Sequence, residues 1–191
     1  MGLGYVGLPI SLKLSKYYKT TGFDVNNLRV KSLKENIDTN NQFKKRDFLR
    51  KKIFFSNKIS EIKKCNFFII CVPTPINKSK KPDLKFVMNS FNILKKVIKK
   101  GDIIVLESTV YPGVTEKFTK ELQIGINMIN NKDFFVCYSP ERINPGDKEN
   151  ELSKIDKILA YDGKNKIVKK KLKLIYSKIC KNLIFTNKIK E

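Results

Sequence analysis

The chain begins with the run MGLGYVG (residues 1–7), which places three glycines at the spacing G-x-G-x-x-G. A turn of this kind joins the first buried strand of a βαβ unit to a helix whose amino end receives the pyrophosphate of a dinucleotide. Gly2 makes the tight bend, Gly4 lets the backbone approach the pyrophosphate, and Gly7 lets helix and strand pack closely. The spacing predicts a dinucleotide-binding α/β domain. Because the turn starts at residue 2, we expect a sheet that lacks its first strand.

An acidic residue follows the glycines at the distance that a dinucleotide site requires. Residues 8–18 form a helix-compatible run, and residues 20–25 (TTGFDV) are typical of a short strand with Asp24 near its end. A carboxylate roughly 20 residues beyond the glycines can accept hydrogen bonds from the adenosine ribose hydroxyls and repel a 2′-phosphate. We therefore predict NAD rather than NADP as the cofactor. The alternative interpretation is that Asp24 is an ordinary turn aspartate.

The size and hydropathy of the chain fit one domain. Its 191 residues are 41% hydrophobic, enough for one substantial core. No apolar run approaches the roughly 18 to 20 residues of a membrane span. Residue 1 also leads into the glycine turn rather than into a signal peptide. We expect a soluble, cytoplasmic protein with no membrane partner, and a single domain over residues 1–191.

The formal net charge of +22 is the feature that points toward nucleic acid. The arginines are Arg29, Arg46, Arg50 and Arg142, and the rest of the 40 basic residues are lysines. This lysine excess accompanies abundant asparagine, isoleucine and phenylalanine, as an A+T-biased genome would produce. Solvated lysines on helix faces need no partner. We therefore predict no specific nucleic-acid partner, but salt-sensitive adhesion to polyanions.

The four cysteines and the absence of histidine restrict the chemistry. Cys65, Cys71, Cys137 and Cys180 form no C-x-x-C pair and no spacing suited to zinc, so no metal site is predicted. Cys71 and Cys137 fall in apolar strand-like runs, where a small buried thiol is expected. Without histidine, proton transfer would use Glu, Asp, Lys, a thiolate or water.

Strand-like and helix-like segments alternate along the chain, which predicts a Rossmann-like, doubly wound parallel sheet covered on both faces. Val87, Phe91 and Leu94, for example, recur at three- and four-residue spacing and predict a helix with one face on the sheet. Further strands are predicted at residues 53–55, 67–72, 103–106 and 134–138, and helices at residues 27–35, 84–99, 115–122 and 166–179.

Three polar segments follow apolar strands, where an open α/β sheet binds its ligands. The first is CVPTP (residues 71–75), in which Thr74 offers a hydroxyl. The second is ESTVYPGVT (residues 107–115), and the third is YSPERINPGD (residues 138–147). Each segment alone could be an ordinary connection. Together with the glycine turn they predict a shared cleft for cofactor and substrate.

The ordered motifs GLGYVGLP, GFDVN, CVPTP, ESTVYPGVTE and YSPERINPGD resemble the N-terminal NAD-binding domain of the UDP-glucose/GDP-mannose dehydrogenase family. The resemblance covers residues 2–185. The run SPERINPG resembles the branch that oxidises UDP-N-acetylglucosamine or its relatives. UDP-glucose dehydrogenases usually carry a second glutamate where this chain has Pro145. The chain also has Asn150 where the branch commonly has a histidine.

The resemblance implies a four-electron oxidation in which two NAD molecules successively take hydride from C6 of the sugar, giving a UDP-linked uronic acid. Glu141 matches the family's acid, implied in proton transfer around thioester hydrolysis, and Arg142 matches a position that meets the sugar. The resemblance further implies that the cofactor's adenosine ribose contacts Asp24 and Arg29. Thr74 and Thr109 are implied to form the nicotinamide side, and Thr109 to hold a catalytic water as well. The implied contacts to the pyrophosphate come from Gly2, Gly4, Tyr5, Val6 and Gly7.

The family's second oxidation uses a cysteine thiolate that traps the aldehyde as a thiohemiacetal and then leaves a hydrolysable thioester. That cysteine lies in a later domain, and none of the four cysteines here stands in its glycine-rich context. The resemblance thus implies the cofactor part of a homo-oligomeric parent, without the central and C-terminal UDP-sugar-binding domains. Two alternatives stay open: a noncatalytic or decayed nucleotide-binding protein, and a basic nucleic-acid binder.

Overall fold

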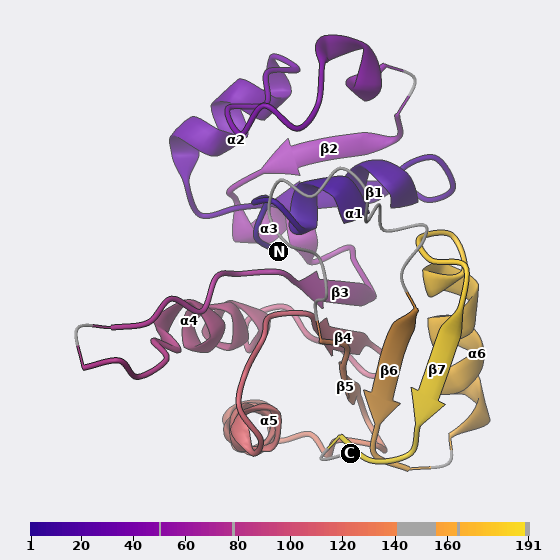
Figure 1. Cartoon of the computed structure of the whole chain (residues 1–191). Helices are drawn as coiled ribbons and strands as arrows, with labels where there is room; N and C mark the ends of the chain where they lie inside the picture. Colours follow the sequence, from indigo (N-terminus) through magenta and orange to yellow (C-terminus); the bar gives the residue numbers. More distant parts are fainter. Residues whose placement is uncertain (50, 78, 141–155, 164, 190–191) are drawn as a thin grey trace.

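A computed structural model of the chain describes residues 1–49, 51–77, 79–140, 156–163 and 165–189. Strands and helices alternate along it (Figure 1). The strands are β1 (Thr20–Phe23), β2 (Ile53–Ser56), β3 (Phe67–Ile70), β4 (Ile103–Leu106), β5 (Phe135–Tyr138), β6 (Lys157–Tyr161) and β7 (Leu183–Thr186). The helices are α1 (Gly7–Leu14), α2 (Asn27–Lys34), the short 3-10 turn η1 (Lys45–Phe48), α3 (Ile59–Ile62), α4 (Lys85–Leu94), α5 (Val114–Ile126) and α6 (Lys166–Tyr176).

The strands form two sheets rather than one. β1 pairs with β2 in parallel, and β3 to β7 form a second sheet in the order β3-β4-β5-β6-β7. Every pair in the second sheet is parallel except β5 with β6. The predicted α/β fold with parallel strands and helices on both faces is confirmed. Within the described residues no strand lies between β1 and β3, so the strands divide there into two sheets.

The central strand β4 shows why the larger sheet needs helices on both faces. All of its side chains are buried, as expected of a strand covered on both sides. Ile104 and Leu106 pack in one cluster with α4 and α5, while Ile103 and Val105 pack in another with α1 and α6. Figure 1 shows α4 and α5 on one side of this sheet and α6 on the other. A third cluster, containing Leu3, Leu8, Leu12, Val30, Leu33, Phe48 and Phe55, fills the space under β1 and β2.

The predicted elements exist, with several shifted ends. α1 stops at Leu14 rather than at residue 18, because the next carbonyl, that of Ser15, accepts a hydrogen bond from the Lys52 amide at the start of β2. α5 runs on to Ile126, where Asn127 ends it in the left-handed conformation. α2 and α6 begin as predicted, each capped by an asparagine side chain that accepts two backbone hydrogen bonds.

β6 and β7 were not predicted from the sequence. Their runs, KILAY and LIFT, are short and lie among lysines, so neither alternation nor an apolar run marks them clearly. No helix of the described residues is long and apolar enough to cross a membrane.

Candidate functional site

The glycine turn is packed so tightly that two of its glycines cannot be replaced. Gly2 has φ +83°, and a Cβ there would lie 2.7 Å from the carbonyl oxygen of Cys71. A Cβ on Gly7 would lie 1.8 Å from the carbonyl oxygen of Gly2. A Cβ on Gly4 would meet nothing within 4 Å. Gly2 and Gly7 therefore serve the backbone packing, and Gly4 leaves an open approach to the turn.

The amino end of α1 follows the turn and carries no side-chain cap. Val6 is its N-cap residue and makes no capping hydrogen bond, so the first amides of the helix have no side-chain acceptor there. Tyr5 is exposed, and its carbonyl accepts a hydrogen bond from Gln42 at 3.2 Å. A helix end of this kind suits an anionic group such as a pyrophosphate.

Asp24, at the end of β1, both holds the turn and faces a cavity. Its Oδ2 accepts a hydrogen bond from the Leu3 amide at 2.8 Å, and its Oδ1 accepts one from the Asn26 amide at 2.9 Å. The carboxylate also lines a cavity of about 300 Å³ beside Gly4 and Arg29. Asp24 therefore does act as a turn aspartate, the alternative interpretation given above. The same hydrogen bonds hold its carboxylate at the wall of the cavity.

Arg29, on α2, is 8% exposed and is held from three sides. Its Nε donates to the Leu3 carbonyl at 2.9 Å, and its Nη1 donates to Asp38 at 2.7 Å and to Thr39 at 2.9 Å. Its Nη2 is buried and has no hydrogen-bond partner. A buried guanidinium nitrogen without an acceptor costs free energy unless a ligand supplies one, and Arg29 lines the cavity together with Asp24.

Asp38 is a functional support that the sequence analysis missed. Its Oδ1 binds Arg29 and the Asn40 amide, and its Oδ2 accepts from the amides of Gln42 and Phe43. The carboxylate therefore fixes the loop after α2 and the arginine at the same time. Nothing in the local sequence marked it, because the partners lie up to nine residues away.

Thr74 and Thr109, predicted to share the nicotinamide side, come together in the structure. The Thr74 hydroxyl donates to the Thr109 carbonyl at 2.8 Å, which joins the segments after β3 and β4. Next to them the Ser108 hydroxyl donates to the Val72 carbonyl at 2.6 Å. Both strand ends are thus tied to each other at the carboxyl edge of the sheet, where an open α/β fold binds ligands.

Behind these strand ends lies a buried ionic cluster, also missed from the sequence. Lys157 of β6 donates to Glu107 Oε2 at 2.5 Å and to the Pro140 carbonyl at 3.2 Å. The Tyr176 hydroxyl of α6 donates to Glu107 Oε1 at 2.5 Å. Burial and the adjacent Glu107 raise the pKa of Tyr176 well above its usual value, so it stays a hydrogen-bond donor. The cluster fixes the residues that precede Thr109 and the segment that follows β5.

Two predicted residues, Glu141 and Arg142, lie outside the described part of the chain. The segment leading to them is described: the Ser139 hydroxyl donates to the Ile158 carbonyl at 2.7 Å. The Cys137 thiol just before it is fully buried, and burial raises its pKa far above the usual range, which excludes it as a nucleophile.

The sequence matches a known domain over most of its length. The model of the UDP-glucose/GDP-mannose dehydrogenase family, NAD binding domain, matches residues 1–180. The chain belongs to this family. The resemblance read from the five motifs is confirmed, as is NAD as the cofactor of the domain. The open approach at Gly4, the uncapped helix end and the unpartnered Arg29 Nη2 fit that cofactor.

Relatives of established name support the same family. UDP-N-acetyl-D-glucosamine 6-dehydrogenase of Salmonella typhi is 45% identical over 160 residues, which are 83% of this chain and 38% of that protein. Protein CapL of Staphylococcus aureus is 43% identical over 161 residues, 84% of this chain and 38% of that protein. The chain spans less than half the length of these curated relatives.

A solved structure has the same architecture. The UDP-D-ManNAc dehydrogenase from Pyrococcus horikoshii superposes with a TM-score of 0.87 at 26% identity, over 98% of this chain and 46% of that one. A ternary complex of GDP-mannose dehydrogenase from Pseudomonas aeruginosa, at 18% identity and a TM-score of 0.84, shows the shared fold. This chain thus corresponds to somewhat less than half of each.

Proposed function

We propose that this chain is the NAD-binding part of an enzyme that oxidises the C6 alcohol of a UDP-N-acetylhexosamine to the uronic acid, a precursor for surface polysaccharide. The observation that carries the proposal is the cavity beside the glycine turn, which combines Gly4, the Asp24 carboxylate and the buried Arg29. The sugar class is supported by 45% identity to a UDP-N-acetyl-D-glucosamine 6-dehydrogenase.

The residues of this chain would each have a physical task. Asp24 would accept hydrogen bonds from the adenosine ribose with the lone pairs that Leu3 and Asn26 leave, and Arg29 Nη2 would donate to an oxygen in the same cavity. Gly2, Gly4, Tyr5, Val6 and Gly7 would place backbone amides around the pyrophosphate. NAD supplies the acceptor for hydride when it is bound.

At the other end of the cleft, Thr74 and Thr109 would line the nicotinamide side, and the Thr109 hydroxyl would orient a water. Thr109 suits this task because its carbonyl already binds Thr74, which fixes its backbone. Glu141 would move protons during thioester hydrolysis, and Arg142 would contact the sugar. The nucleophilic cysteine would come from a further domain of a homo-oligomeric parent.

We place the reaction in the cytoplasm. None of the four cysteines forms a disulfide, as is usual where thiols are kept reduced. Because the chain spans 38% of its Salmonella relative, we expect the isolated chain to bind NAD at most weakly and without turnover. A noncatalytic or decayed NAD-binding protein is the alternative, and it predicts the same binding.

A chimera separates the two proposals. The chain would be joined to the remaining part of the Salmonella typhi enzyme, and NADH formation would be followed with UDP-N-acetylglucosamine, UDP-N-acetylgalactosamine and UDP-glucose. We expect turnover with an N-acetylated sugar. Glu141→Gln in the chimera should slow turnover by about 100-fold or more while NAD affinity changes little. A chimera that binds NAD but oxidises none of the sugars would support the noncatalytic alternative.

A further inference from the structure

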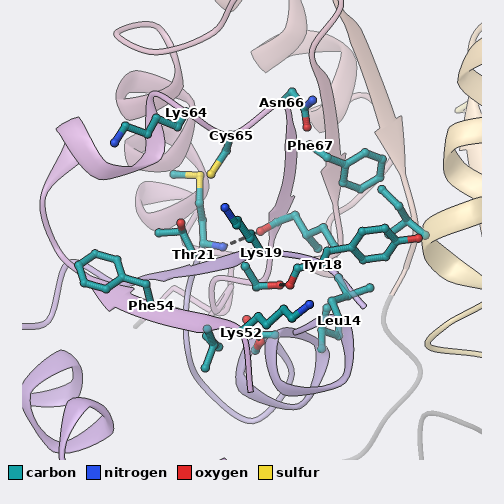
Figure 2. A pocket seen from close by; sticks show the side chains of 18 of the residues that line it. Leu14, Tyr18, Lys19, Thr21, Lys52, Phe54, Lys64, Cys65, Asn66 and Phe67 are labelled. Carbon is teal, nitrogen blue, oxygen red and sulfur yellow. Dashed lines mark hydrogen bonds between the residues drawn. The ribbon is translucent and has the colours of Figure 1, made fainter. Parts of the chain in front are cut away.

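The loop after α2, residues 38–43, is a part of the cofactor region to which none of the five motifs extends. Thr39 and Asn40 of this loop line the cavity of about 300 Å³ that also contains Asp24 and Arg29. The larger cavity between the two sheets, shown in Figure 2, has no residue of this loop in its wall. Of these two cavities, the loop therefore contributes only to the one beside Asp24.

Two side chains of α2 and its loop hold the glycine turn by its carbonyl groups. The Arg29 Nε donates to the Leu3 carbonyl at 2.9 Å. The Gln42 Nε2 donates to the Tyr5 carbonyl at 3.2 Å. These two carbonyls flank Gly4, where the turn is open. The turn is therefore fastened to the rest of the molecule on both sides of its open residue.

The direction of these carbonyls sets the direction of two amides. None of the described peptide bonds is cis, and in a trans peptide unit the C=O and N–H groups point to opposite sides. With the Leu3 and Tyr5 carbonyls bonded to α2 and its loop, the amides of Gly4 and Val6 point the other way. Within the described residues neither amide has a backbone acceptor. Both belong to the amides proposed above to surround the pyrophosphate, so the orientation of these two peptide units decides whether they can meet it.

The Asp38 carboxylate holds both of the donors. Its side chain is fully buried. Its Oδ1 accepts from Arg29 Nη1 at 2.7 Å and from the Asn40 amide at 3.1 Å. Its Oδ2 accepts from the amides of Gln42 at 2.9 Å and Phe43 at 3.1 Å. One carboxylate thus fixes Arg29 by its guanidinium and Gln42 by its backbone.

The same carboxylate determines where the spare nitrogen of Arg29 lies. Nε is used by Leu3, and Nη1 by Asp38 and the Thr39 hydroxyl. Because the guanidinium is planar and rigid, fixing Nε and Nη1 also fixes Nη2, the buried nitrogen without a partner. Arg29 lines the cavity, so this donor is held for a ligand there.

We propose that Asp38 is a positioning residue for NAD binding. Acting through Arg29 and Gln42, its carboxylate orients the two peptide units of the glycine turn and holds Arg29 Nη2 in place for the cofactor. The inference rests on the NAD site of the proposed function and adds to it a residue that does not itself contact the cofactor. The loop of residues 38–43 is then a third cofactor-binding element, beside the glycine turn and the end of β1.

The test measures NAD affinity in the full-length chimera by isothermal titration, together with the Tm of each variant. Asp38→Asn keeps the size of the side chain but replaces one acceptor oxygen by a donor, so Arg29 and the loop lose part of their support. We expect NAD to bind about tenfold less tightly or weaker still.

Asp102→Asn is the matched control. Asp102 is also buried, and it pairs with the Lys99 ammonium and accepts from the Lys99 amide, but it precedes β4 and does not line the cavity. This variant should also lower Tm, while its NAD affinity stays within about twofold of the parent. An equal loss of affinity in Asp38→Asn and Asp102→Asn would reduce Asp38 to a structural role and overturn the proposal, as would parental affinity in Asp38→Asn.

A double variant tests whether Asp38 acts through the arginine. Arg29→Met should by itself weaken NAD binding about tenfold or more. Asp38→Asn added to Arg29→Met should cost less than about threefold further, because only the contact through Gln42 is left to lose. Losses that multiply in full would show that Asp38 acts independently of Arg29, against the proposal.

Gln42→Leu tests the second contact without changing a buried group. Gln42 is exposed, so this variant should keep the parental Tm, and we expect it to weaken NAD binding about threefold because the Tyr5 carbonyl loses its donor. Parental affinity here would overturn the positioning of the turn, even if Asp38→Asn failed to fold. None of these measurements needs turnover. A chimera that oxidises no sugar would therefore contradict the catalytic proposal and leave the role of Asp38 fully tested.

Discussion

The two sheets use the same device, a buried carboxylate paired with a cation, for opposite purposes. In the larger sheet both oxygens of Glu107 are bonded, one to Lys157 and one to Tyr176. In the β1–β2 part Asp38 is likewise saturated, but its partner Arg29 keeps one buried nitrogen without an acceptor at the wall of a cavity. The comparison teaches that two buried ion pairs can differ in whether a donor is left over: Arg29 keeps one at a cavity wall, where the proposed cofactor would supply its acceptor.

The largest effect is expected from removing the cation of the buried cluster formed by Glu107, Lys157 and Tyr176. Lys157→Met would remove the cation that pairs with the buried Glu107 carboxylate. We expect the free energy of unfolding to fall by about 3 to 5 kcal/mol, because an unpaired buried charge is strongly destabilising. Urea unfolding followed by circular dichroism measures the change.

Its control removes both charges. Glu107→Gln combined with Lys157→Met should recover most of the lost stability, since neutral groups of similar size replace a buried pair at little cost. If the double variant is as unstable as the single one, the loss comes from packing rather than from the unpaired carboxylate.

The second change acts on the ligand side and leaves the larger sheet intact. In the full-length chimera, Asp24→Asn should weaken NAD binding about 10- to 100-fold, because a charged acceptor of ribose hydroxyls is lost, and should narrow the preference for NAD over NADP. Isothermal titration with both cofactors measures it. Asp47→Asn changes a half-buried aspartate of η1 that caps a turn in the same part of the chain and does not line the cavity; it is the matched control and should bind NAD as the parent does. Unchanged selectivity in Asp24→Asn would remove that carboxylate from the site.

The third change acts at the junction between the two sheets. Because burial lowers the Met1 amine pKa in the folded state, the unfolded chain binds the proton more tightly just below pH 8. Stability should therefore rise with pH toward 8, by at most about 1.4 kcal/mol per pH unit, and level off above it. Amino-terminal acetylation should flatten this part of the profile. The measurement is Tm from pH 6 to 9, with retention of Met1 verified by intact mass; an unchanged slope after acetylation would assign it to another group.

The smallest expected effect concerns the positive net charge of the chain, to which both sheets and their helices contribute. With 40 basic residues against 18 acidic ones, the chain should adhere to arbitrary DNA at low salt. We expect this binding to disappear at about 200 mM salt, while NAD still raises Tm. Retention of tight DNA binding at that salt would favour the nucleic-acid alternative.

The features that were predictable are those written in contiguous sequence. The glycine turn, the helix of Val87 and Phe91, and the buried β4 follow from spacing and periodicity, and the strand-end positions of Thr74 and Thr109 follow from the rule for open sheets. Asp38, Glu107 and Lys157 could not be assigned in this way. Their roles depend on partners brought close by folding, such as Tyr176, 69 residues from Glu107. The same limit applies to β6 and β7, which are strands because their neighbours complete the sheet.

The contact between Gly7 and Gly2 has a consequence for how the gene can change. Any substitution at the first or second base of a glycine codon adds a side-chain carbon or stops translation, and at Gly7 that carbon would overlap the Gly2 carbonyl. No single-base change at these two positions of the codon gives a residue that fits the turn. A mutation that changes the amino acid at Gly7 therefore disrupts the glycine turn itself rather than a single side-chain contact.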